Sequence, residues 1–145
     1  MGNLPTTPHA ESPDMRLLTA ALMLTAAPAL AETYACTVSA FTTFSQSDTA
    51  FIEANQRKTY ELTPEGNSVT LTMRSADFEG YTATYTVTRR EMLDTIAERE
   101  GRTGVNLLVL PPRPADEIDR EGAFKATLTA QGSHYTNSWL LACTR

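Results

Sequence analysis

The sequence predicts a mainly β protein: a small antiparallel barrel or a strongly curved sheet, with one or two short helices. Apolar and polar residues alternate along several short segments, which is the pattern of half-buried strands. Turns rich in glycine and proline separate these segments. The two cysteines, Cys36 and Cys143, lie on apolar faces near the two ends of this region. A disulfide between them would join the terminal strands, which favours a closed barrel. A two-sheet sandwich is the alternative.

The first 31 residues are expected to be a leader and a secretory signal peptide that is removed. Met15 and Arg16 form a short positive start, and an uncharged apolar run follows at 17–27. Ala29–Ala31 then offers the small-x-small site that a signal peptidase cuts. The run is about 11 residues long, shorter than the roughly 20 that a membrane-spanning helix needs. We therefore expect a single β-rich domain at 32–145, periplasmic or secreted. The sequence leaves open whether translation starts at Met1 or Met15.

Export would place both cysteines in an oxidising compartment, where disulfides persist. The alternation puts Cys36 on the apolar face of the first strand and Cys143 on that of the last. We therefore predict a Cys36–Cys143 bridge that ties almost the whole domain into one loop. Two separate buried thiols are the alternative.

About six or seven strands are expected along the chain. They cover 34–39, 59–62, 69–73, 81–87, 105–110, 124–130 and 139–143. The clearest is 81–87, in which threonine occupies every second position. Turns at 64–67, 77–80 and 131–134 separate neighbouring strands, and the first of them predicts a hairpin. The run at 105–110 is apolar almost throughout and is expected to be buried on both faces. Prolines then begin an exposed loop at 111–121.

Two helices are predicted between the strands. Thr88 and Glu91 have the spacing of a capping box, which begins a helix that would end near Gly101. Its apolar stripe would consist of Met92, Leu93, Ile96 and Ala97. A second, weaker helix is expected at 48–55.

The composition argues against several classes of function. The net charge is −5, and Arg89-Arg90 is the one basic cluster, so nucleic acid is not an expected partner. Zinc prefers sets of cysteine and histidine that the sequence lacks. The acidic residues in 116–121 do not have the spacing of a calcium loop. No metal or other cofactor and no catalytic residue is therefore predicted.

The candidate binding residues are Arg113, His134 and Tyr135. Arg113 lies between prolines in the long 111–121 loop, and the other two lie in the turn before the last strand. Loops held by a stiff scaffold are where binding residues concentrate. We therefore expect a non-enzymatic module that binds a protein, a peptide or a small molecule. A small periplasmic hydrolase that uses carboxylates or His134 and a structural envelope protein are the alternatives.

The layout also carries a resemblance. It combines a Tyr34-x-Cys36 start after the signal peptide, alternation throughout and a terminal cysteine. In this it resembles small secreted β-barrel inhibitors such as the periplasmic lysozyme inhibitors. The resemblance implies a barrel fold and an inhibitor-like role. None of the inhibitory motifs of that family matches positions in this sequence, so no functional residue is transferred.

Overall fold

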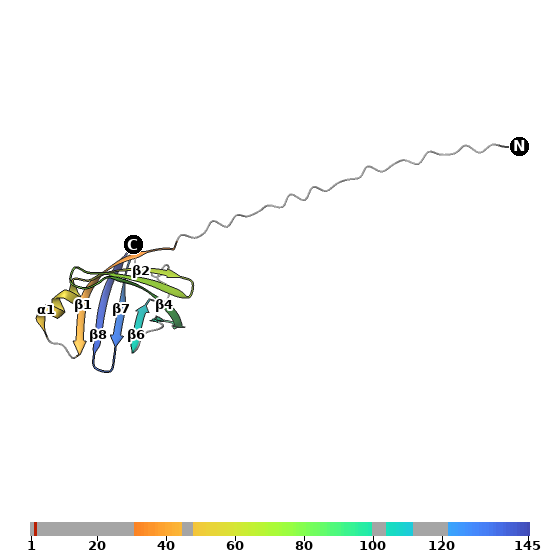
Figure 1. The fold of residues 1–145 in the computed structure, drawn as a ribbon. Helices are drawn as coiled ribbons and strands as arrows, with labels where there is room; N and C mark the ends of the chain where they lie inside the picture. The colour runs from red at the N-terminus through yellow and green to blue at the C-terminus, as the bar shows by residue number, and fades with distance from the viewer. Residues whose placement is uncertain (1, 3–30, 45–47, 100–103, 112–121) are drawn as a thin grey trace.

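A computed structural model of the chain describes residues 2, 31–44, 48–99, 104–111 and 122–145. The predicted leader and signal peptide lie outside the described residues, apart from residues 2 and 31. Residues 112–121, which include Arg113, also lie outside the described residues. The described chain forms a closed barrel of eight antiparallel strands and one short helix (Figure 1). The expected antiparallel barrel is confirmed, with eight strands instead of six or seven.

The strands follow one another around the barrel in chain order, and the last pairs with the first. The elements are β1 (Tyr34–Phe44), α1 (Thr49–Gln56), β2 (Thr59–Glu65), β3 (Ser68–Arg74), β4 (Tyr81–Arg90), β5 (Thr95–Arg99), β6 (Val105–Leu110), β7 (Ala123–Gln131) and β8 (Thr136–Thr144). We call the end at which β1 begins and β8 finishes the disulfide end. The opposite end, with α1, the β3–β4 loop and the β7–β8 turn, is the helix end (Figure 1).

Side chains fill the interior of the barrel, as is usual for eight strands. Residues at every second position along the strands are buried, which the alternation predicts for 34–36, 69–73, 124–128 and 139–143. Leu62, Leu71, Leu108 and Leu141 are fully buried. Each such side chain stabilises the fold by about 1.5–3 kcal/mol relative to an exposed position. The filled interior leaves the outer face of the barrel and its two ends accessible.

A disulfide joins Cys36 and Cys143, as predicted. The two residues lie directly opposite each other in the pairing of β1 with β8, with their Cα atoms 4.0 Å apart. The bridge therefore fastens the two strands that close the barrel, near the disulfide end.

The weaker of the two predicted helices is the one that forms. It is α1, and Asp48 is its N-cap, with the Ala50 amide donating to Asp48 Oδ1 at 3.0 Å. This arrangement satisfies one of the backbone amides that the first turn of a helix leaves unpaired.

The helix predicted from Thr88 to Gly101 is wrong in the described residues. β4 continues to Arg90, and β5 begins at Thr95 after a turn in which the Glu91 amide donates to the Asp94 carbonyl at 2.7 Å. The capping-box residues thus belong to a strand end and a hairpin turn. Met92 and Leu93 are exposed at this turn, while Thr95 and Ala97 are buried. A strand at 95–99 pairs with both β4 and β6, and the barrel needs it in order to close.

The strand at 105–110 is buried on one face, and not on both as predicted. Leu108 and Leu110 point into the core, whereas Val105 is exposed. A strand in a closed barrel has one inner and one outer face, so a continuous apolar run does not require burial on both.

The strand assignment of Thr88 leads to a stability prediction. Its hydroxyl donates to Glu98 Oε1 at 3.2 Å on an exposed surface, so Thr88→Ala should change the free energy of unfolding by less than about 0.5 kcal/mol. Asp48→Ala, which removes a real cap, should cost about 1 kcal/mol. Urea unfolding of both variants measures the difference. A larger loss for Thr88→Ala than for Asp48→Ala would contradict the assignment.

Candidate functional site

The β7–β8 turn holds two of the three predicted binding residues, His134 and Tyr135. The Gly132 amide donates to the Tyr135 carbonyl at 3.0 Å and closes a tight turn. The Tyr135 ring lies against Gly132 so closely that a Cβ at 132 would be 2.5 Å from ring atom Cε1. The Tyr135 ring can therefore lie in this position because residue 132 has no side chain. The Tyr135 side chain remains 42% exposed.

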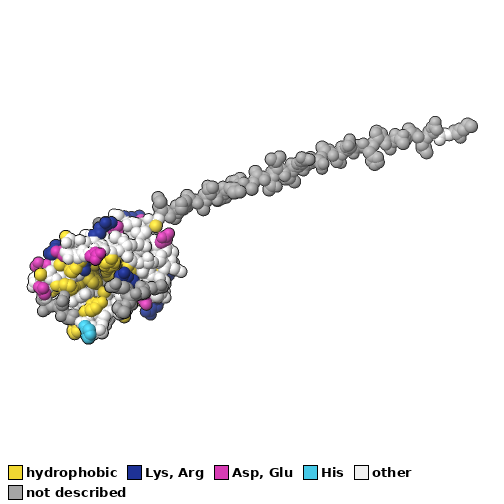
Figure 2. All heavy atoms as spheres, in the orientation of Figure 1, with side chains coloured by type: hydrophobic (Ala, Val, Ile, Leu, Met, Phe, Trp, Pro, Cys, Tyr) yellow, Lys and Arg dark blue, Asp and Glu magenta, His cyan; other side chains and the backbone are white. Residues whose placement is uncertain are grey.

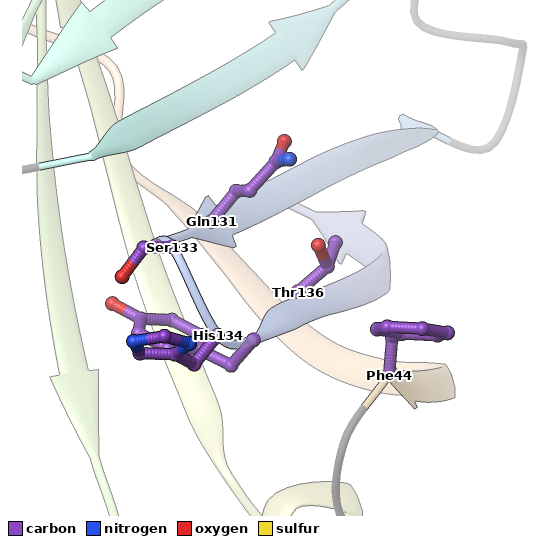
Figure 3. Close-up of a pocket in the computed structure, with 7 residues that line it drawn as sticks. Phe44, Gln131, Ser133, His134 and Thr136 are labelled. Carbon is purple, nitrogen blue, oxygen red and sulfur yellow. The ribbon is translucent and has the colours of Figure 1, made fainter.

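Three hollows in the described surface share Tyr135. The first, of about 420 Å³, lies between the turn and the end of β1, where the exposed Phe44 projects beside Thr136 (Figure 3). The second, also of about 420 Å³, is bordered by Gly104 and Ser133. The third, of about 360 Å³, is lined by residues of the β3–β4 loop and of β4, β5, β6 and β7, together with Tyr135. These volumes lie in the range of small-ligand sites, roughly 300–1,000 Å³.

Arg99 contributes a positive charge to the third hollow. Thr95 and Ala97, which share its face of β5, are buried, so the strand carries Arg99 on its inner side at the helix end. The guanidinium carbon lies 5.2 Å from the centroid of the Tyr81 ring, a cation–π distance. Among the described residues no carboxylate forms an ion pair with Arg99, although Glu79 lines the same hollow. Asn106 and Tyr135 also line it.

An aromatic cluster fills the corner between α1 and the barrel. Its members are Phe41, Phe51, Phe78 and Trp139. Ring centroids are 5.2 Å apart for Phe41 and Trp139 and 6.0 Å apart for Phe41 and Phe51. The indole nitrogen of Trp139 is buried and has no hydrogen-bond partner in the described part of the chain. This cluster seats α1 on β1 and closes one side of the helix end.

Lys58 reaches into this cluster. Its Nζ lies 4.1 Å from the centroid of the Phe78 ring and 5.0 Å from that of Trp139, and it donates to Asn55 Oδ1 at 2.6 Å. Burial lowers the pKa of Lys58 to about 8. In the described residues no carboxylate forms an ion pair with this amine. Lys58 is therefore, like Arg99, a cation at the helix end that has no anionic partner among the described residues.

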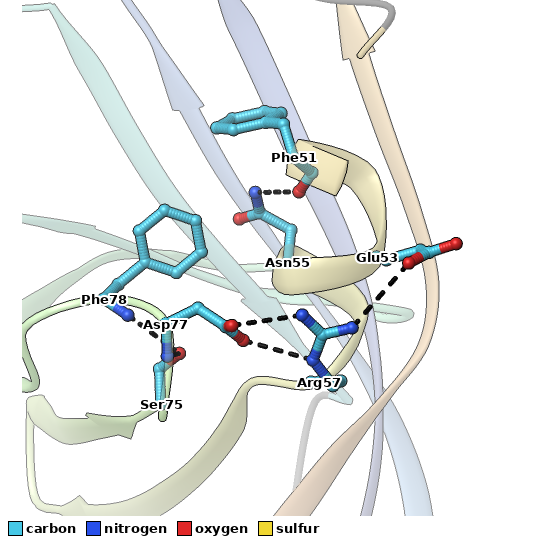
Figure 4. Close-up of polar contacts among 7 residues, drawn as sticks. All are labelled: Phe51, Glu53, Asn55, Arg57, Ser75, Asp77 and Phe78. Carbon is cyan, nitrogen blue, oxygen red and sulfur yellow. Dashed lines mark hydrogen bonds and ion pairs between the residues drawn. The ribbon is translucent and has the colours of Figure 1, made fainter. Parts of the chain in front are cut away.

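A polar contact ties α1 to the β3–β4 loop. The Arg57 guanidinium donates to both oxygens of Asp77 at 3.1 Å, and Asn55 donates to the Phe51 carbonyl at 2.8 Å (Figure 4). Ser75 Oγ accepts from the Phe78 amide at 3.2 Å. These bonds hold Phe78 beside Lys58.

His134 and Tyr135 lie at the rim of the helix end, whereas Arg113 lies outside the described residues. His134 is exposed, and in the described chain no hydrogen bond joins it to a serine hydroxyl or a carboxylate. Sequence reasoning missed Arg99 and Lys58. Arg99 fell within the wrongly predicted helix, and the spacing Thr95, Ala97, Arg99 was the signal that could have placed it on an inner face.

Metal-ligating groups do not gather in the part of the chain that the structure describes: no three His, Cys, Asp or Glu side chains are placed to hold an ion. The acidic residues at 116–121 lie outside it.

Within the described residues, no helix has the length and apolar character needed to cross a bilayer.

Comparison of the chain with protein-family models, with curated proteins and with solved structures gives no match.

Proposed function

We propose that the protein is a small exported, non-enzymatic binding module, inhibitor-like in layout, that takes its ligand at the helix end of the barrel. The observation that carries this proposal is the convergence of three hollows on the exposed ring of Tyr135. A tyrosine offers a large apolar contact and a hydroxyl while losing little conformational entropy. The turn that holds it is short and hydrogen-bonded, so the anchor is positioned before a ligand arrives.

The fold supports a role in binding at this end. The interior is filled by core side chains, so a ligand would contact the rim and not enter deep into the barrel. Phe44 adds a second exposed aromatic ring next to the turn. Exposed aromatic side chains beside polar ones are typical of protein and peptide interfaces as well as of small-ligand sites.

The disulfide supports the part of the proposal that concerns export. The Cys36–Cys143 disulfide fits a periplasmic or extracellular protein, because thiols are kept reduced in the cytosol. The pattern of a signal peptide at 15–31 predicts the same location.

Tyr135→Ala should abolish most ligand capture without unfolding the protein. The side chain is substantially exposed, so its loss costs little stability, whereas an aromatic anchor is typically worth about 2 kcal/mol or more of binding energy. Immobilised wild type and variant are incubated with a periplasmic extract, and mass spectrometry identifies the proteins and small molecules retained. We expect one component enriched on the wild type about tenfold or more over the variant.

Leu93→Ala is the matched control, because Leu93 is exposed at the opposite end of the barrel. It should retain the same component as the wild type. A component held equally by wild type and Tyr135→Ala would contradict binding at the helix end, and so would the absence of any enriched component.

A further inference from the structure

We propose that the ligand carries a carboxylate group and that Arg99 binds this group in the hollow between Tyr81 and Tyr135. The inference rests on the proposed function and adds the chemical class of the ligand. Three observations support this assignment: where Arg99 lies, the lack of a carboxylate partner for it among the described residues, and the shape of the hollow.

Most other arginines among the described residues form an ion pair with a carboxylate, whereas Arg99 pairs with none of the described carboxylates. Arg57 pairs with Asp77, Arg74 with Glu61, and Arg145 with Glu32. Those side chains lie on exposed surface, where an ion pair contributes little. Arg99 is half-buried on the inner side of β5, where a charge loses part of its hydration. An anionic group from a ligand would therefore gain more from Arg99 than from the exposed arginines.

The surroundings of Arg99 suit a planar anion. Contact with the Tyr81 ring restrains the guanidinium, which lowers the entropy lost when it binds a ligand. A restrained guanidinium binds a carboxylate through two parallel hydrogen bonds. Asn106 lines the same hollow of about 360 Å³ and adds an amide group that can donate. Glu79 also lines it but is exposed, so water screens its charge more effectively than that of Arg99.

The electrostatics of the helix end agree with this assignment. The net charge of the whole chain is −5. At the helix end, however, Lys58 and Arg99 are two cations that form no ion pair with a carboxylate of the described residues. A pKa of about 8 for Lys58 is consistent with an amine that is partly desolvated and has no anion of the described chain beside it. Arg99, which lines the hollow, favours the approach of a negatively charged group to it, and Lys58 adds a second positive charge at the same end of the barrel.

Benzoate and benzamide test the charge requirement directly, because they have the same ring and nearly the same shape. Each is titrated into the ¹⁵N-labelled protein, and NMR spectra follow the backbone amides together with the Arg99 Nε–H and Asn106 amide signals. Benzoate should shift the signals of Arg99, Asn106 and Tyr135, and it should bind about tenfold or more tightly than benzamide. Equal affinities, or no benzoate binding, would overturn the inference.

Arg99→Gln should lower benzoate affinity about tenfold or more and leave benzamide unchanged. Arg89→Gln is the matched control: it removes the same charge from an exposed site at the disulfide end. An equal loss in both variants would show that general charge attracts benzoate, and would overturn the assignment to Arg99.

Two sources of the carboxylate are separated by a further pair of probes. An acetylated tripeptide with a free C-terminus and its C-terminal amide are titrated in the same way. Benzoate binding together with selective binding of the free peptide acid at Arg99 assigns the site to a peptide terminus, and benzoate binding alone assigns it to a small organic acid. If Tyr135 proves essential for capture from the extract while no carboxylate probe depends on Arg99, the proposed function stands and this inference fails.

Discussion

Replacing Cys36 and Cys143 together by alanine is expected to lower the free energy of unfolding by about 2–5 kcal/mol. The bridge closes a loop across a sequence separation of 107 residues. In the chain-entropy model, a loop of roughly 100 residues contributes about 4.7 kcal/mol by restricting the unfolded chain. The bridge also joins β1 to β8, so its loss weakens the one pairing that links the two ends of the domain. Urea unfolding of the wild type and the double variant measures the effect.

The reduced wild-type protein provides the control. It should unfold at nearly the same urea concentration as the double variant, because both lack the covalent link but keep the strand pairing. A loss below about 1 kcal/mol in both would contradict a stabilising role for the bridge. Loss in the double variant alone would point to packing of the sulfur atoms instead.

Trp139→Ala should destabilise the protein by about 3–5 kcal/mol, the cost typical of removing a buried large aromatic side chain. Trp139 is 6% exposed and contacts the ring of Phe41 and the amine of Lys58. Its removal would leave a cavity under α1 and deprive Lys58 of one of its two aromatic neighbours. Urea unfolding followed by far-UV circular dichroism measures the loss, since the variant has no tryptophan fluorescence.

Trp139→Phe separates packing from the polar atom. Phenylalanine keeps a ring in the cluster and removes the indole nitrogen, which has no partner in the described structure. We expect it to cost clearly less than Trp139→Ala, because no hydrogen bond of the described residues is lost. If both variants were as stable as the wild type, the cluster would not hold α1 in place.

The sequence predicted the strands and the disulfide because both depend on local alternation. Once 34–38 and 139–143 are recognised as strands with apolar faces, the cysteines necessarily lie on those faces. The helix at 88–101 failed for the opposite reason. Thr88 and Glu91 carry a valid helix-start signal, but the unpaired edges of β4 and β6 both require a strand between them. Tertiary pairing overrode the local preference.

The candidate site at the rim was harder to predict than the fold. His134 and Tyr135 lie in a turn that glycine and polar residues signal locally. The hollow around Arg99 instead combines residues from β4, β5, β6, β7 and the β7–β8 turn, which come together only when the barrel closes. Lys58 likewise acquires its aromatic neighbours from the β3–β4 loop and β8. No single stretch of sequence carries these combinations.

Hydrogen–deuterium exchange of the full protein with and without the captured component tests binding at the helix end most directly. Mass spectrometry of peptic peptides should show slower exchange around 131–136 and at the neighbouring ends of β5 and β6. The β4–β5 turn, with Met92 and Leu93 at the disulfide end, should exchange as before (one face of the molecule is shown in Figure 2). Slower exchange at that turn with an unchanged helix end would contradict the proposed site.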